Sequence, residues 1–207
     1  MEFSDLARSR RSVRVYAPDA RIDDAELEAL FAEVVLSPSS FNLQHWQFVV
    51  VRDAARKQAL RGLCYGQAQV EQCAALVLVC GRLDAHEDAD RIYAAEPAAT
   101  RDKYVPMIKG VYHERAALQR EEAIRSGALA AMSLMYAARN RGWDSGPMIG
   151  FDAAKVASLL ALAPTSVPVM MVTLGRAVTE ALPPRGYRRP VSEVVRLETM
   201  DGPALGA

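Results

Sequence analysis

Short, mostly apolar runs alternate along the chain with longer segments in which apolar residues recur every three or four positions. Three runs, 46–51 (WQFVVV), 75–80 (ALVLVC) and 168–174 (PVMMVTL), are rich in β-branched or aromatic residues and predict strands. None of them alternates with polar residues, so both faces of each strand should be covered. This pattern favours helices on the two sides of one sheet.

Helices are predicted between these runs from apolar spacing and capping residues. After Asp23 or Asp24, either of which can cap a helix, Leu27, Leu30 and Val34 follow helical spacing. Further helices are expected over 4–11, 53–61, 66–73, 126–141 and 153–162. The Ala- and Met-rich segment 126–141 should be nearly buried.

Two stretches are harder to assign. The region 84–125 is expected to hold helices with breaks at Pro97 and Pro106, and to be a lid or specificity region. Within the polar tail, 191–197 alternates like a strand. Few strands and a long helical middle indicate the α+β class, with a single domain over 1–207.

Charge narrows the possible partners. Lys plus Arg and Asp plus Glu each number 25, so the formal net charge is zero and neither a nucleic-acid nor a membrane partner is indicated. No basic leader or apolar run of about 20 residues is present, which predicts a cytoplasmic protein. The three cysteines form no C-x-x-C pair, which argues against a disulfide framework and a zinc site.

The arginines are unevenly spread. Arg8, Arg10, Arg11 and Arg14 crowd the N-terminal stretch, and Arg185, Arg188 and Arg189 crowd another near the C-terminus. In an extended turn, Arg10, Ser12 and Arg14 project to one side, where two guanidinium groups and a hydroxyl can hold a phosphate. The same spacing also fits a solvated basic surface.

Two loops concentrate other candidate groups. Residues 38–46 (PSSFNLQHW) carry hydroxyls and amides that suit the edge of a heterocycle, although they also fit an Asx-type turn. Residues 144–152 (DSGPMIGFD) carry glycines that permit close backbone approach to a flat ligand, although they also fit a plain inter-helix loop. No G-x-G-x-x-G or P-loop motif is present.

Taken together, four short motifs resemble the nitroreductase family of FMN-dependent enzymes. RRSVRVY is similar to the family's Arg-x-Ser-x-Arg/Lys opening, and SPSSFNLQHWQFVVV to its Pro-Ser-Ser-x-Asn-x-Gln-Pro-Trp block. GPMIGFD is similar to its Pro-x-x-Gly-Phe block, and YRRPVSEVV to its C-terminal Arg-x-Pro element. The four motifs stand in the family's order from about Arg8 to Val195.

The resemblance implies an architecture and a cofactor. It implies a three-layer α/β/α sandwich with a mostly antiparallel sheet, a helical excursion at about 84–125, and a tail at about 180–207 that wraps a second subunit and exchanges a C-terminal strand with it. Bound FMN would take hydride from NAD(P)H and pass it, in a two-step exchange, to a nitroaromatic, quinone or similar small acceptor. The flavin carries the chemistry, so no side chain is named as catalytic.

The resemblance also implies site residues. The phosphate and the polar side of the flavin would be held by Arg10, Arg11, Ser12, Arg14 and Arg188. The partner subunit of a homodimer would contribute Pro38, Ser39, Ser40 and Asn42, whereas Gln67 or Gln69 would meet the pyrimidine edge or the ribityl chain. The ring face would be covered by Pro147, Met148, Ile149 and Gly150.

The sequence departs from the family pattern at two positions. His45 stands where the family has Pro, which predicts a less rigid loop, and Ile149 stands where some members have Glu. Two other functions stay open. One is a flavin-binding, flavin-consuming or dehalogenating relative without fast NAD(P)H turnover; the other is a dimeric scaffold that has lost flavin, against which the intact Arg10, Ser12, Arg14 and Arg188 argue.

Overall fold

A computed structural model describes residues 1–206. The strands are β1 (Trp46–Val51), β2 (Ala75–Arg82), β3 (Asp144–Met148) and β4 (Ser166–Gly175). They form one antiparallel sheet in the order β1-β2-β4-β3. The α-helices are α1 (Phe3–Ser9), α2 (Asp24–Val34), α3 (Ala54–Leu63), α4 (Gln69–Gln72), α5 (Ala89–Ile92), α6 (Ala98–Tyr112), α7 (Ala116–Asn140), α8 (Ala153–Leu159) and α9 (Val191–Val194).

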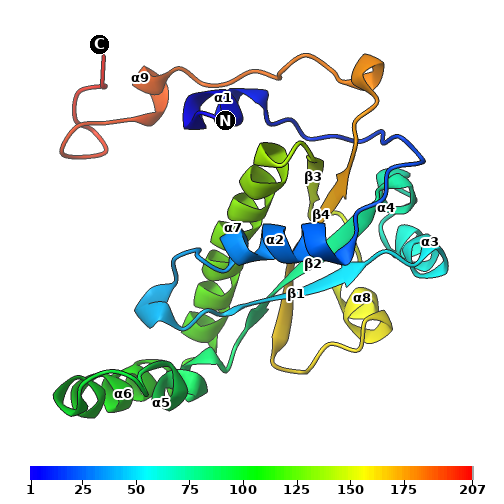
Figure 1. Cartoon of the computed structure of the whole chain (residues 1–207). Helices are drawn as coiled ribbons and strands as arrows, with labels where there is room; N and C mark the ends of the chain where they lie inside the picture. Colours follow the sequence, from blue (N-terminus) through cyan, green and yellow to red (C-terminus); the bar gives the residue numbers. More distant parts are fainter. Residues whose placement is uncertain (207) are drawn as a thin grey trace.

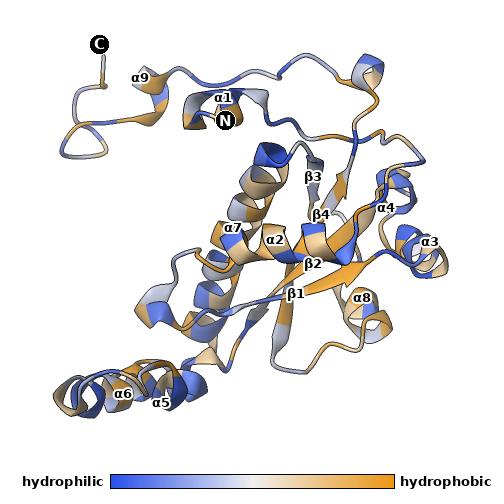
Figure 2. Ribbon diagram, viewed as in Figure 1, coloured by the Kyte–Doolittle hydropathy of each residue, from blue (hydrophilic) through white to orange (hydrophobic). Residues whose placement is uncertain are grey.

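The sheet lies between two layers of helices, as the apolar strands predict (Figure 1). Strand β2 shows why: Val77 and Val79 pack in the same cluster as buried residues of α2 and α7. Leu76 and Leu78 point the other way and pack with residues of α3, α4 and α8. Figure 2 shows apolar residues along much of β1, β2 and β4, whereas the edge strand β3 is more polar. The predicted α/β/α sandwich with an antiparallel sheet is confirmed.

Capping residues set several boundaries where the sequence indicates them. The side chain of Asp23 accepts a hydrogen bond from the backbone N–H of Glu26. The side chain of Glu26 accepts one from the backbone N–H of Asp23, so the two residues form a capping box at the start of α2. Asp53 and Asp152 cap α3 and α8 by one hydrogen bond each, which the side chain accepts from the backbone N–H three residues further on. Strand β1 has the predicted bounds.

Strand β4 contains a proline, Pro168, at a point beyond the end of β3, where β4 is paired only with β2. Pro168 faces Cys80 while Met170 faces Val79, so Val169 is the extra residue of a β-bulge. Proline has no N–H for the ladder, and a bulge is where a central strand accommodates this loss. The strand therefore begins at Ser166, before the proline, rather than at Pro168.

The helical region differs from prediction at Pro106 and at the start of α7. The break expected at Pro106 is wrong, because Pro106 lies inside α6. Pro106 and Asp102 are both exposed, so water can satisfy the carbonyl that loses its partner. The buried helix expected from Ser126 begins ten residues earlier, at Ala116, after Glu114 turns the chain with a φ of 54°.

Two further segments have a different type of secondary structure from the one expected. The segment 144–152, expected as a loop, begins with the edge strand β3, whose Gly and Pro residues hide its pairing with β4. The strand expected at 191–197 is instead the single helical turn α9 followed by an isolated bridge between Arg196 and Ala204. The tail lies across one end of the molecule beside α1 (Figure 1).

The close approach of α7 to β2 gives a test of this packing. A Cβ atom at Gly81 would lie 2.3 Å from the carbonyl oxygen of Ala123. Gly81→Ala should therefore destabilise the fold by about 3 kcal/mol in urea unfolding, since the backbone of α7 must move. Gly110→Ala in α6 is the matched control, because no heavy atom lies within 4 Å of its added Cβ. Equal effects of the two substitutions would contradict this packing.

Candidate functional site

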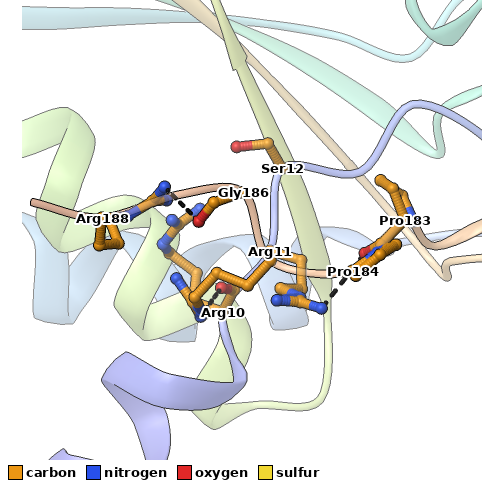
Figure 3. Close-up of a pocket in the computed structure, with 8 residues that line it drawn as sticks. Arg10, Arg11, Ser12, Pro183, Pro184, Gly186 and Arg188 are labelled. Carbon is orange, nitrogen blue, oxygen red and sulfur yellow. Dashed lines mark hydrogen bonds between the residues drawn. The ribbon is translucent and has the colours of Figure 1, made fainter.

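A cavity of about 130 Å³ lies where the two ends of the chain meet (Figure 3). The N-terminal side comes from the turn that follows α1, and the other side comes from the tail. The lining residues are Arg10, Arg11, Ser12, Pro183, Pro184, Arg185, Gly186 and Arg188. Four of these eight are arginines, so the cavity is strongly basic.

Hydrogen bonds hold the two segments together. Arg185 donates from Nη2 to the carbonyls of Arg8 at 2.6 Å and Arg10 at 2.9 Å, where α1 ends. A cation suits this position because the last carbonyls of a helix lack helical partners. Arg11 donates from Nη2 to the carbonyl of Pro183 at 3.2 Å. The tail is thus fastened across the turn that follows α1.

The charge of this cavity has no compensation within residues 1–206. None of its four arginines forms an ion pair with a carboxylate in this part of the chain, although many other arginines do. Burial lowers the pKa of Arg10, and the nearby Arg185, Arg188 and Arg11 lower it further. Nη1 of Arg10 is buried without a hydrogen-bond partner. The cavity therefore has the donors and the charge that an oxyanion would satisfy.

The structure brings together four of the five residues expected around a phosphate. Arg10, Arg11 and Ser12 meet Arg188 across the cavity, whereas Arg14 is exposed and does not line it. Sequence reasoning noted the second arginine cluster but assigned a role only to Arg188. Arg185 could have been found from that cluster, yet its contacts with the carbonyls of Arg8 and Arg10 depend on the fold.

From the cavity, the N-terminal segment runs beside strand β3. Ser12 and Ser145 form a parallel bridge, and the N–H of Val13 donates to the carbonyl of Ser145 at 2.9 Å. Gly146 permits this approach, because a Cβ there would lie 2.3 Å from the carbonyl oxygen of Val13. Strand β3 then leads to Pro147 and Met148, so the cavity and the expected ring-face segment belong to one continuous edge.

The end of that edge offers free backbone donors. The N–H groups of Ile149 and Gly150 donate to no acceptor within the described chain. The side chain of Ile149 is 75% exposed. Adjacent free N–H groups beside an exposed apolar side chain are suited to the polar edge and the face of a planar ligand.

The two glutamines expected near a ring lie beside this segment but are engaged within the chain. Gln67 donates from Nε2 to the carbonyls of Gly150 at 2.9 Å and Cys64 at 3.1 Å. Gln69, which is buried, donates to Oε1 of Gln67 at 2.8 Å. Gln67 thus fixes the position of Gly150, and a ligand contact by either glutamine stays a prediction.

The loop with Pro38, Ser39, Ser40 and Asn42 lies elsewhere in the chain. It follows α2 and packs near α5 and α6, away from α1 and the tail (Figure 1). None of its four expected site residues lines the arginine cavity. A single chain therefore does not bring this loop to the cavity.

His45 anchors the end of this loop. Its side chain is 2% exposed, and its Nδ1 lies 3.2 Å from Oγ of Ser126 in α7. The hydrogen bond between His45 and Ser126 thus restrains this end of the loop, where a proline ring would restrain the backbone directly. Burial lowers the pKa of His45 to about 4, helped by the neighbouring His86 and Arg82.

A sandwich of this topology, with an arginine-lined cavity beside the edge strand β3 and free N–H groups just beyond that strand, defines an α+β protein whose surface offers a site suited to an anion. No helix of residues 1–206 has the length and apolar character needed to cross a bilayer. The same residues contain no cluster of three or more His, Cys, Asp or Glu side chains that could hold a metal ion.

Comparison with known proteins identifies the family. The model of the nitroreductase family matches residues 7–176, and the chain belongs to this family of oxidoreductases. MhqN of Bacillus subtilis, provisionally named an NAD(P)H nitroreductase, is 38% identical over 201 residues, which cover 94% of this chain and 98% of MhqN.

Solved structures confirm the fold. The crystal structure of ydfN from Bacillus subtilis, provisionally named a nitroreductase, superimposes with a TM-score of 0.91 at 37% identity and covers 94% of this chain and 97% of its own. A protein of Exiguobacterium sibiricum with the same provisional name, solved in complex with FMN, gives a TM-score of 0.87 at 30% identity, covering 94% and 96%.

The buried His45 predicts a pH-dependent stability. The unfolded state binds the proton of this imidazole below about pH 6.5 and the folded state only below about pH 4, so stability should fall as the pH drops through this window. The full loss is about 3 kcal/mol. His45→Asn, which keeps a polar partner for Ser126, should show a shallower fall in thermal midpoint between pH 7 and 4. Identical pH profiles of the two proteins would show that His45 is not responsible.

Proposed function

We propose that this chain is an FMN-dependent NAD(P)H oxidoreductase that binds the FMN phosphate in the arginine cavity. The observation that carries the proposal is the uncompensated charge of Arg10, Arg11, Arg185 and Arg188, with Nη1 of Arg10 buried and unpartnered. Guanidinium groups match phosphate oxygens in geometry as well as charge. The similar Exiguobacterium protein, whose structure was solved in complex with FMN, supports the same cofactor.

In this proposal the flavin lies along the edge that Ser12 and β3 form, with its phosphate at one end and its ring at the other. Arg10 and Ser12 would hold the phosphate, Ser145 would lie beside the ribityl chain, and residues 147–150 would meet the ring. The free N–H groups of Ile149 and Gly150 would donate to the polar edge of the ring, where they would stabilise negative charge. Gln67 holds Gly150 in place for this contact.

When bound, FMN supplies a two-step transfer of electrons from NAD(P)H to a nitroaromatic, quinone or similar small acceptor. Both substrates use one site in turn, since the sequence has no separate nucleotide-binding motif. The exposed side chain of Ile149 leaves the space beside it apolar and uncharged, which suits flat, neutral acceptors.

A second copy of the chain completes the site in this proposal. The arginine cavity of their own chain is not lined by Pro38, Ser39, Ser40 or Asn42, so in this proposal they serve the cavity of a partner. The tail has the apolar surface to wrap that partner, because Val191, Val194 and Met200 are exposed. The expected exchange of the tail between subunits belongs to this proposal.

The assembly is tested by light scattering coupled to size-exclusion chromatography. The apolar surface exposed on the tail should be buried against a second chain, so the expected mass is that of two chains at micromolar concentration. A chain that binds FMN tightly as a monomer would contradict the shared site.

The assignment of activity is tested by rapid mixing under anaerobic conditions. The protein with FMN bound should lose its flavin absorbance within seconds of mixing with NADH or NADPH. Retained flavin colour in the presence of both nucleotides would instead indicate a flavin-binding or flavin-consuming relative.

Arg10→Ala tests the phosphate position. Loss of a charged hydrogen bond of about 1.5–3 kcal/mol should weaken FMN about 10- to 100-fold in a fluorescence titration. Riboflavin, which lacks the phosphate, should bind the variant and the original protein equally. Arg14→Ala is the matched control: it lies outside the cavity and should not share the FMN-specific loss. If Arg10→Ala weakened riboflavin as much as FMN, the phosphate would lie elsewhere.

A further inference from the structure

The loop 38–45 has an unusual backbone. Phe41, Asn42 and Gln44 adopt left-handed conformations, with φ of 51°, 55° and 51°. Residues other than glycine rarely adopt this region, and the surrounding structure must hold them there. Ser39 contributes from inside the loop, since its Oγ accepts from the N–H of Gln44 at 2.9 Å.

The helical excursion supplies the rest of the support. Leu43 of the loop is buried in a cluster with Ala85, Ala89, Ile108 and Tyr112. Tyr93 donates its hydroxyl to the carbonyl of Phe41 at 3.4 Å. The hydroxyl of Tyr112, the last residue of α6, donates to Oγ of Ser40 at 3.1 Å.

Tyr112 is held rigidly for this contact. Its side chain is 2% exposed, and its ring stacks on His86 with centroids 5.5 Å apart. On another side, its ring meets His45 edge to face at 6.2 Å. Burial raises the pKa of Tyr112, so its hydroxyl keeps its proton and remains a donor at neutral pH.

The hydrogen bond from Tyr112 limits the directions in which the hydroxyl of Ser40 can point its proton. Because Tyr112 donates into Oγ of Ser40, the proton of Ser40 must point away from Tyr112. A serine hydroxyl has one proton and two lone pairs, and no acceptor among residues 1–206 takes the proton of Ser40, so this proton is available to a group on the open side of Ser40. Ser40 is only partly buried, so that side is accessible.

We propose that Tyr112 is a positioning residue, which orients the hydroxyl of Ser40 as a hydrogen-bond donor toward FMN bound by the partner subunit. The inference rests on the proposed function. It gives the excursion 84–125 a role in cofactor binding, although none of its residues lines the arginine cavity.

A double-mutant cycle on FMN affinity tests this inference. Tyr112→Phe and Ser40→Ala should each weaken FMN about three- to tenfold, the effect of one neutral hydrogen bond. Because Tyr112 acts through Ser40, the double variant should bind no more weakly than Ser40→Ala alone. Thermal unfolding of the flavin-free proteins shows whether each variant is folded.

Tyr104→Phe is the matched control. Tyr104 lies in the same helix and stacks on Tyr93 at 6.0 Å, but its hydroxyl has no hydrogen-bond partner among residues 1–206. Its loss should leave FMN affinity unchanged. Additive losses in the cycle, or an unchanged affinity in Tyr112→Phe, would overturn the inference. Failure of the unaltered protein to bind FMN would refute the proposed function instead.

Discussion

Repulsion among four arginines, brought together where the chain ends meet, is the constraint on which the site depends. Arg10 and Arg11 approach Arg185 and Arg188 without a carboxylate from the described chain to offset them. Like charges in a partly buried cavity repel more strongly than in water. The hydrogen bonds from Arg185 to the end of α1 hold this arrangement in place. Such a cavity stores unfavourable electrostatic energy that an anion relieves on binding.

The sandwich explains why the cavity leads to an extended site. Strand β3 is at the edge of the sheet, and the N-terminal segment passes from the cavity along that strand at Ser12 and Val13. The edge ends at two backbone N–H groups without acceptors in the chain, those of Ile149 and Gly150. Charge at one end and donors at the other match a ligand that has a phosphate and a polar heterocycle.

What the sequence could predict followed from local chemistry. The strands at WQFVVV and ALVLVC and the caps at Asp23, Asp53 and Asp152 depend on neighbouring residues, so the sequence predicts them and the structure confirms them. Strand β3 was missed because its Gly and Pro residues lack strand character and its pairing depends on β4. The approach of Arg185 to α1 joins residues more than 170 positions apart, which no local pattern encodes. The resemblance of the motifs to the nitroreductase family implies the site residues. The structure separates these residues into two groups, those along the arginine cavity and β3 and those in the loop 38–45.

The proposed FMN site joins the arginine cavity of one chain to the loop 38–45 of another chain. A heterodimer of one Arg10→Ala chain and one Ser40→Ala chain, isolated with two affinity tags, tests it directly. In a shared site, one of the two cavities is intact and the other carries both defects. FMN titration should then show half of the sites at the affinity of the unaltered protein. If every site showed a single-variant affinity, with none restored, the loop and the cavity would belong to the same chain and the account would be wrong.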